Sequence, residues 1–209
     1  MRKVPINGGD VITLSTNGFE RTLAINDTHV FFSYVIQQWS DEIPAVYIAK
    51  INKQGGNVIV LASHSTIRSY PSKITVDDSF VYWVETAGTI DKVSINGGMI
   101  TNIAAGLNDP QQIVVDANSV YWTEYAKGKP GAGAIKKIPI SGGEVTTLAS
   151  GLNGPFDITI KDTYIYWTEQ GTNGKDVSIK KTWSPPGQAC GNNRHRRAEA
   201  RFAEVRPGS

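Results

Sequence analysis

The sequence is poor in the residues on which several classes of protein depend. Its 209 residues include one cysteine, Cys190, which excludes an intramolecular disulfide framework and a cysteine-based zinc cluster. No apolar run approaches the length of a membrane span, and no apolar segment follows Arg2 and Lys3 as it does in a signal peptide. We therefore expect a chain that, as given, stays in the cytoplasm and does not contact a membrane.

Charged residues are also scarce, at 19%, and the formal net charge is +2. The segment 184–209 holds five of the eight arginines and two glutamates, which leaves a net charge of −1 for residues 1–183. A near-neutral body does not provide the broad basic surface that nucleic acid requires, so no nucleic-acid partner is expected.

What the sequence does contain is a repeat of strands and turns. An aromatic segment recurs four times, and its closing aromatic residues are spaced by 51, 39 and 45 positions at Phe32, Trp83, Trp122 and Trp167. A Gly-Gly pair recurs with spacings of 47, 42 and 45, beginning at Gly8, Gly55, Gly97 and Gly142. Two independent markers with one period of this size, in strand-rich sequence, are typical of propeller blades.

Alternating apolar residues divide each repeat into four short strands, and no helical periodicity competes in the first 183 residues. We predict an all-β fold, a β-propeller of four-stranded antiparallel blades, with about four blades and terminal strand closure. The predicted propeller domain covers 1–183, with blades at 20–63, 72–105, 111–150, and 156–183 completed by 10–15. The remaining segment, 184–209, is predicted to be a basic tail outside the propeller, without stable structure.

One part of the repeat is present twice. Residues 2–6 match the third strand of a blade, although 156–183 already supplies that strand for the closing blade. The duplication leaves two alternatives open: a ring closed by one chain, or a homodimer in which two chains exchange terminal strands. A third possibility is that the chain is a truncated piece of a longer array.

The Tyr-Trp-Thr-Glu runs at 121–124 and 166–169 resemble the YWTD repeats of lipoprotein-receptor propellers. The looser pattern of Val-Tyr-Trp, then Gly-Gly and a Thr-Leu-Ala strand, resembles bacterial TolB-like six-bladed propellers of unassigned function. This resemblance implies the propeller fold over roughly residues 1–182. It also implies a parent family that is usually extracytoplasmic.

Loops that differ between equivalent blades are the predicted binding surface, because a repeated scaffold varies where it is functional. The long connection after the second strand of the first blade contains Trp39, which either stacks on a ligand or folds back as a local hydrophobic plug. The predicted ligand-binding residues are Gln37, Trp39, Asp41, Arg68, Tyr70, Glu124 and Tyr125.

A glutamate recurs at the end of the second strand of three blades, at Glu85, Glu124 and Glu169. Either each carboxylate stabilises its own blade through hydrogen bonds, or the three line the channel and hold calcium. The chain has no Gly-x-Ser-x-Gly, His-Glu-x-x-His or P-loop motif. The sequence therefore favours a non-catalytic scaffold without a cofactor that presents loops to a protein, peptide or glycan. The alternatives are a calcium-dependent hydrolase or lactonase-like propeller, or a truncated fragment without present function.

Overall fold

The computed structural model describes all residues except 17–18, 37–44, 66–68, 171–177 and 184–209. The described residues form antiparallel sheets, which confirms the prediction of an all-β protein built from four-stranded sheets. Three sheets, here called blades 1 to 3, have four strands each. Their strands are β3 (Phe19–Ile25), β4 (His29–Ile36), β5 (Ala45–Asn52), β6 (Ile59–Ser65), β7 (Pro71–Val76), β8 (Phe80–Glu85), β9 (Thr89–Ser94), β10 (Thr101–Ala105), β11 (Pro110–Val115), β12 (Ser119–Glu124), β13 (Gly133–Pro139) and β14 (Thr146–Leu152).

A smaller sheet lies at each end of this series. Blade 4 has three strands, and a two-stranded hairpin precedes blade 1. These strands are β15 (Pro155–Lys161), β16 (Tyr164–Glu169) and β17 (Ser178–Trp183) in blade 4, with β1 (Arg2–Lys3) and β2 (Ile12–Thr13) in the hairpin. A short 3-10 helix, η1 (Ala126–Gly128), follows β12.

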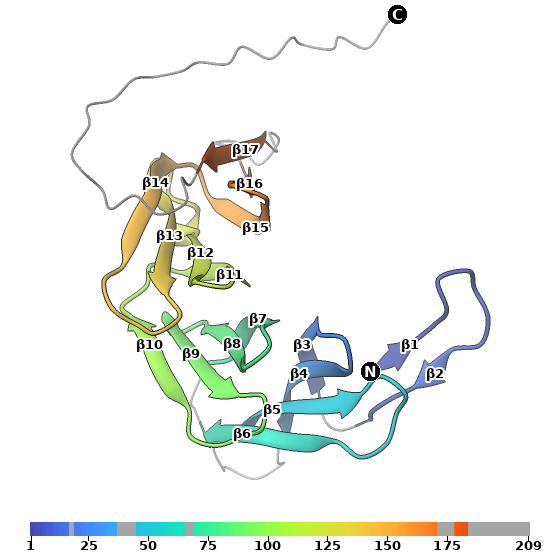
Figure 1. Ribbon diagram of the computed structural model, residues 1–209. Coiled ribbons are helices and arrows are strands. Elements are labelled where there is room, and N and C mark those ends of the chain that lie inside the picture. The colour runs from blue at the N-terminus through green and yellow to red at the C-terminus, as the bar shows by residue number, and fades with distance from the viewer. Residues whose placement is uncertain (17–18, 37–44, 66–68, 171–177, 184–209) are drawn as a thin grey trace, which may run out of the picture.

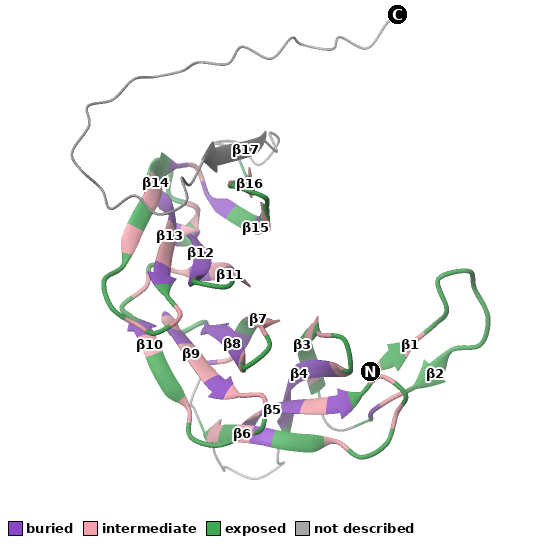
Figure 2. Cartoon of the chain, in the orientation of Figure 1, coloured by how far each residue is buried: buried purple, intermediate pink, exposed green. Residues whose placement is uncertain are grey.

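The sheets follow one another along an open arc, with the first strand of each blade on the concave side and the last strand outside (Figure 1). Adjacent blades pack face to face through apolar side chains. Tyr82 and Val84 of blade 2, for example, share one buried cluster with Ile113 and Trp122 of blade 3. In blades 2 and 3, burial is concentrated in the second strand, which is covered on both faces (Figure 2).

The turn between the first two strands is built by a side chain that accepts hydrogen bonds from the backbone. In blade 2, Asp77 Oδ1 accepts hydrogen bonds from the amides of Ser79 and Phe80, both at 2.7 Å. The other oxygen of Asp77 accepts the Tyr82 hydroxyl at 2.7 Å, and Asn26 builds the same turn in blade 1. Such Asx turns explain why a short polar residue follows each first strand.

The terminal strand closure that the sequence predicted is not found among the described residues. Ile12–Thr13 pairs with Arg2–Lys3 instead of completing blade 4, in which β17 is bonded to β16 alone. A hairpin joined by a Gly-Gly turn forms at small entropic cost because its strands are neighbours in the chain. The carbonyl of Met1 also accepts the amides of Leu14 and Ser15, at 3.0 and 3.2 Å, which holds the two strands together.

Candidate functional site: a cation-lined cavity on the concave side

The three recurring glutamates lie inside the blades. Each is buried and accepts a hydrogen bond from the indole nitrogen of the tryptophan two residues earlier. Side chains two residues apart on a strand lie on the same face, which places the indole beside the carboxylate. The Nε1–Oε1 distances are 2.9 Å for Trp83–Glu85, 3.3 Å for Trp122–Glu124 and 3.1 Å for Trp167–Glu169.

The second oxygen of each carboxylate is also engaged. Ser69 Oγ donates to Glu85 at 2.7 Å, Lys136 Nζ lies 2.8 Å from Glu124, and the Asn153 amide donates to Glu169 at 3.1 Å. This geometry corresponds to the structural alternative of the sequence analysis, in which each carboxylate stabilises its own blade. Among the described residues, no three potential metal ligands come together, so the calcium set of Glu85, Glu124 and Glu169 is not assembled there.

A histidine that the sequence analysis left aside joins two blades at this level. His64, in the last strand of blade 1, lies with Nε2 3.2 Å from Glu85 Oε1 at the end of the second strand of blade 2. The hydrogen bond to Glu85 raises the pKa of His64, although partial desolvation opposes it. His64 Nδ1 is buried and has no hydrogen-bond partner among the described residues.

Only some of the predicted ligand-binding residues belong to the described part of the chain. Gln37, Trp39, Asp41 and Arg68 lie outside the described residues, and their binding role stays a prediction. Glu124 is buried with both oxygens engaged, so its carboxylate is not exposed at the surface.

The two predicted tyrosines contact neighbouring strands and blades. The guanidinium of Arg21 stacks on the ring of Tyr70, 4.5 Å from its centroid. The hydroxyl of Tyr125 hydrogen-bonds Gln170, and its ring meets Phe156 edge-on at 6.1 Å. Tyr70 therefore orders a basic side chain, and Tyr125 ties blade 3 to blade 4.

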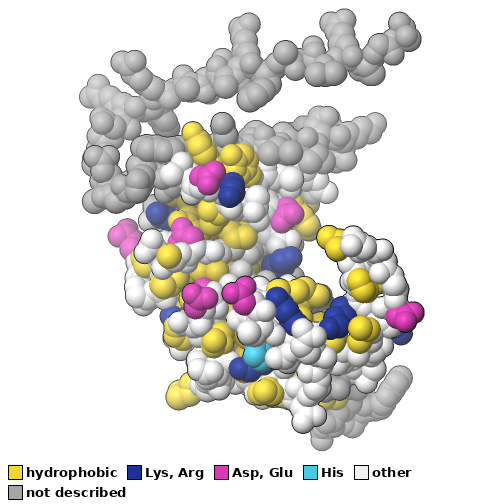
Figure 3. Space-filling view, turned by 45° about the vertical axis from the view of Figure 1, so that its right-hand side comes forward, with side chains coloured by type: hydrophobic (Ala, Val, Ile, Leu, Met, Phe, Trp, Pro, Cys, Tyr) yellow, Lys and Arg dark blue, Asp and Glu magenta, His cyan; other side chains and the backbone are white. Residues whose placement is uncertain are grey.

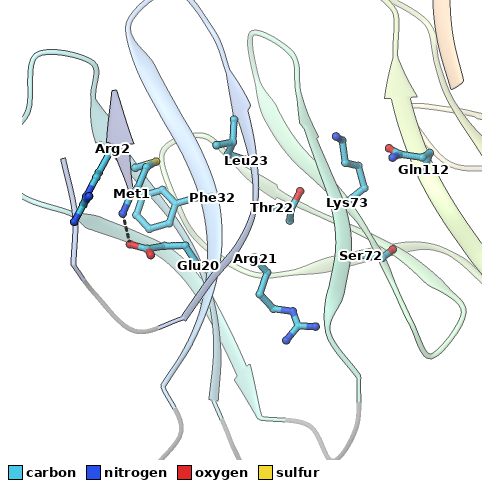
Figure 4. A pocket seen from close by; sticks show the side chains of 10 residues that line it. All are labelled: Met1, Arg2, Glu20, Arg21, Thr22, Leu23, Phe32, Ser72, Lys73 and Gln112. Atoms are coloured by element: carbon cyan, nitrogen blue, oxygen red, sulfur yellow. Dashed lines mark hydrogen bonds and ion pairs between the residues drawn. The ribbon is translucent and has the colours of Figure 1, made fainter. Parts of the chain in front are cut away.

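A hollow of the described surface lies on the concave side of blades 1 to 3 (Figure 4). It has a volume of about 510 Å³, and we call it the inner cavity. Its walls come from the hairpin, from the first two strands of blade 1 and from the first strands of blades 2 and 3. The lining residues are Met1, Arg2, Glu20, Arg21, Thr22, Leu23, Phe32, Ser72, Lys73 and Gln112.

The inner cavity carries an excess of positive charge. Arg2, Arg21 and Lys73 line it, whereas its one acidic side chain, Glu20, lies 3.0 Å from the Met1 amine. Within the described ranges, none of the three basic side chains forms an ion pair with a carboxylate. Figure 3 shows basic side chains on this side of the molecule. The cavity therefore has cationic groups that are not neutralised by described neighbours.

The polar residues that line the inner cavity differ from blade to blade, unlike the recurring buried tryptophans and glutamates. The residue just before the apolar residue that pairs with the recurring aromatic is Thr22 in blade 1, Lys73 in blade 2 and Gln112 in blade 3. Positions that vary while their neighbours repeat are candidates for function. Sequence reasoning missed them because a polar residue on a first strand is also expected wherever a strand faces solvent.

Comparison with known proteins supports the fold and leaves the function open. No family model matches the chain, and no curated protein matches it. The chain is similar to the computationally designed Ika4 protein, with a TM-score of 0.57 and 17% identity over 84% of this chain and 98% of that one.

Two natural proteins are similar at lower identity. The putative TolB of Agrobacterium tumefaciens has a TM-score of 0.55 at 13% identity, with 76% of this chain matching 61% of that one. An oligogalacturonate lyase in complex with manganese has a TM-score of 0.54 at 11% identity, and the matched region covers 76% of this chain and 51% of that one. The chain thus spans only about half to two thirds of these natural relatives.

Fold and comparisons together define the class: the protein is propeller-like, with successive four-stranded antiparallel blades. More particularly, its fold is similar to that of the TolB propellers, at 11–13% identity. Because a propeller fold hosts both binding proteins and enzymes, this likeness does not choose between them. Within the described residues, no helix has the length and apolar content needed to cross a membrane.

Proposed function

We propose that the protein is a binding scaffold whose inner cavity takes a carboxylate-bearing glycan. The observation that supports this proposal is the grouping of Arg2, Arg21 and Lys73 around one hollow of about 510 Å³ without ion-pair partners among the described residues. Unpaired cations that share a cavity lower the free energy of a bound anion more than that of a neutral ligand.

The side chains of the inner cavity suit both parts of such a ligand. Arginine binds a carboxylate with two parallel hydrogen bonds. Because Arg21 is already stacked on Tyr70, its side chain loses less conformational entropy when a ligand binds. Thr22, Ser72 and Gln112 offer hydroxyl and amide groups that pair with sugar hydroxyls.

Binding is favoured over calcium-dependent hydrolysis because the charges have the wrong sign for calcium. A calcium ion requires several oxygen ligands, most often carboxylates. The recurring glutamates are buried and engaged, and Arg21 and Lys73 line the inner cavity. The inner cavity therefore repels a divalent cation.

Isothermal titration with tetragalacturonate tests the proposal, with the neutral maltotetraose as the matched ligand. We expect binding of the acidic tetrasaccharide, and we expect Arg21→Gln to weaken it about tenfold or more, the effect of losing a charge-assisted hydrogen bond. Lys161→Gln, which removes an exposed cation from the first strand of blade 4, is the control and should leave the affinity unchanged.

Two results would count against the proposal. Equal affinity for both tetrasaccharides would show that charge does not determine binding. Binding of a hexaglutamate peptide, sensitive to Arg21→Gln, without binding of either glycan would retain the anion site but replace a glycan by an acidic peptide.

A further inference from the structure

One contact between neighbouring blades occurs three times. Lys50 Nζ donates to the carbonyl of Ile95 at 2.8 Å, and Lys92 Nζ donates to the carbonyl of Ile140 at 2.6 Å. In both cases a lysine in the third strand of one blade reaches the turn after the third strand of the next blade. The equivalent bond from Lys3, on β1, to the carbonyl of Lys53 in blade 1 is 2.6 Å long.

The contact of Lys3 with Lys53 shows which part of a blade the hairpin corresponds to. Since Lys3 binds blade 1 as Lys50 binds blade 2, β1 and β2 occupy the places of the third and fourth strands of a blade that precedes blade 1. No described strand occupies the places of the first and second strands of that blade. The hairpin is thus the outer half of an incomplete blade.

Apolar side chains are exposed where the first and second strands of this incomplete blade would cover them. Val4, the residue after the contacting lysine, is 55% exposed, whereas its equivalents Ile51 and Val93 are 0% and 1% exposed. Leu23, which pairs with the recurring aromatic of blade 1, is 51% exposed, whereas the equivalent Ile74 is 1% exposed. Both residues are of the type that this fold buries between blades.

The other end of the arc has the complementary surface. Tyr82 is fully buried because blade 3 covers it, and Tyr121 is buried because blade 4 covers it. The equivalent Tyr166 of blade 4 is only half-buried and, with Thr159, lines a hollow of about 160 Å³. Blade 4 therefore presents inner strands, β15 and β16, whose face is not covered by a following blade in the described structure.

We propose that a second copy of this chain fills the incomplete blade. The strands β15 and β16 of one copy lie beside β1 and β2 of the other, and Thr159 and Tyr166 cover Leu23 of the other copy. In this arrangement β1 takes the edge of β16 that β17 occupies in the single chain. Two identical junctions close a ring with two-fold symmetry, as closed homo-oligomers require.

The shape of the arc favours a second copy over closure by one chain. The hairpin and blade 4 lie at opposite ends of the open arc (Figure 1). In the proposed ring the second copy covers Leu23 and the hairpin side of the inner cavity, whereas Arg21, Lys73 and Gln112 still line the concave side, so the ligand site narrows to the part that these three residues form.

Cysteine cross-linking between two different variants tests the assembly. In a Cys190→Ser background, one full-length chain carries Leu23→Cys and another carries Thr159→Cys. The structure holds the equivalent pair, Ala24 and Ile74, within one packed cluster. Mixing the two chains under mild oxidation should give a covalent species of twice the chain mass, whereas Leu23→Cys mixed with Glu144→Cys should not.

The double variant, with both cysteines in one chain, distinguishes the two modes of closure. A disulfide within one chain, together with no cross-link between the mixed single variants, would overturn the proposal in favour of single-chain closure. Light scattering provides a second readout: the unmodified protein should have twice the chain mass, and Leu23→Asp should halve it while Val60→Asp, on β6, should not. A monomeric mass for the unmodified protein at every concentration would also overturn the proposal.

Discussion

The replacement of Glu85 by glutamine measures how much a buried recurring carboxylate stabilises its blade. Glu85 accepts hydrogen bonds from Trp83 and Ser69 and lies beside His64, with distances of 2.9, 2.7 and 3.2 Å. Glutamine keeps the shape but removes the charge, and its amide group must face at least one of these donors. A charge-assisted hydrogen bond contributes about 1.5–3 kcal/mol and a neutral one about 1 kcal/mol.

Glu85→Gln replaces two charge-assisted hydrogen bonds by neutral ones and leaves one donor, Trp83 or Ser69, poorly satisfied. Together these changes should lower the free energy of unfolding by roughly 2–3 kcal/mol. For a domain of this size that corresponds to a fall of about 5–10 °C in Tm. Thermal unfolding followed by near-UV circular dichroism measures it, because Trp83 reports on the packing at this site. The control, Glu144→Gln on an exposed turn, should change stability by no more than about 0.5 kcal/mol. A Glu85→Gln protein as stable as the unmodified protein would refute the view that the carboxylate holds the blade together.

The remaining predictions concern the same junction and the turns. Because the pKa of His64 is raised in the folded state, its contribution to stability is complete below the unfolded value of 6.5 and is lost as the pH rises through the folded value. Urea unfolding at several pH values should therefore show stability falling over this range, and His64→Gln should remove that fall. Gly97→Ala should cost about 1–2 kcal/mol more than Gly142→Ala, since both have φ near +85° but a Cβ on Gly97 would lie 3.2 Å from the Leu61 carbonyl oxygen. If urea unfolding gives the same loss of stability for both variants, the close approach of the Leu61 carbonyl to Gly97 does not contribute.

The periodic part of the sequence predicts the blades because the same physical requirement recurs in each of them. A tryptophan donates to the glutamate two residues later in blades 2, 3 and 4, as in Trp83 and Glu85, and a buried aromatic residue, Phe32, takes the place of the tryptophan in blade 1. The four larger sheets span 19–65, 71–105, 110–152 and 155–183, whereas residues 12–13, predicted to complete the last of them, pair with 2–3.

Features that occur once are not predictable in this way. The bond between His64 and Glu85 joins residues of two blades and leaves no periodic trace. The cationic inner cavity depends on which face of each first strand is turned toward the concave side, and alternation alone does not decide this for Lys73. The pairing of β1 with β2 also competes with an equally good pattern for blade closure, and only the three-dimensional contact of Lys3 with Lys53 shows which one forms.

The most direct test of the central claim compares two forms of one ligand that differ only in charge. Isothermal titration with tetragalacturonate and with its methyl ester keeps the sugar chain and removes the carboxylates. If the inner cavity binds an acidic glycan through Arg2, Arg21 and Lys73, the free acid should bind at least about tenfold more tightly than the ester. The Arg21→Gln, Lys73→Gln double variant should then lose most of this difference. Equal affinities for acid and ester, or an unchanged difference in the double variant, would contradict the assignment of the cavity.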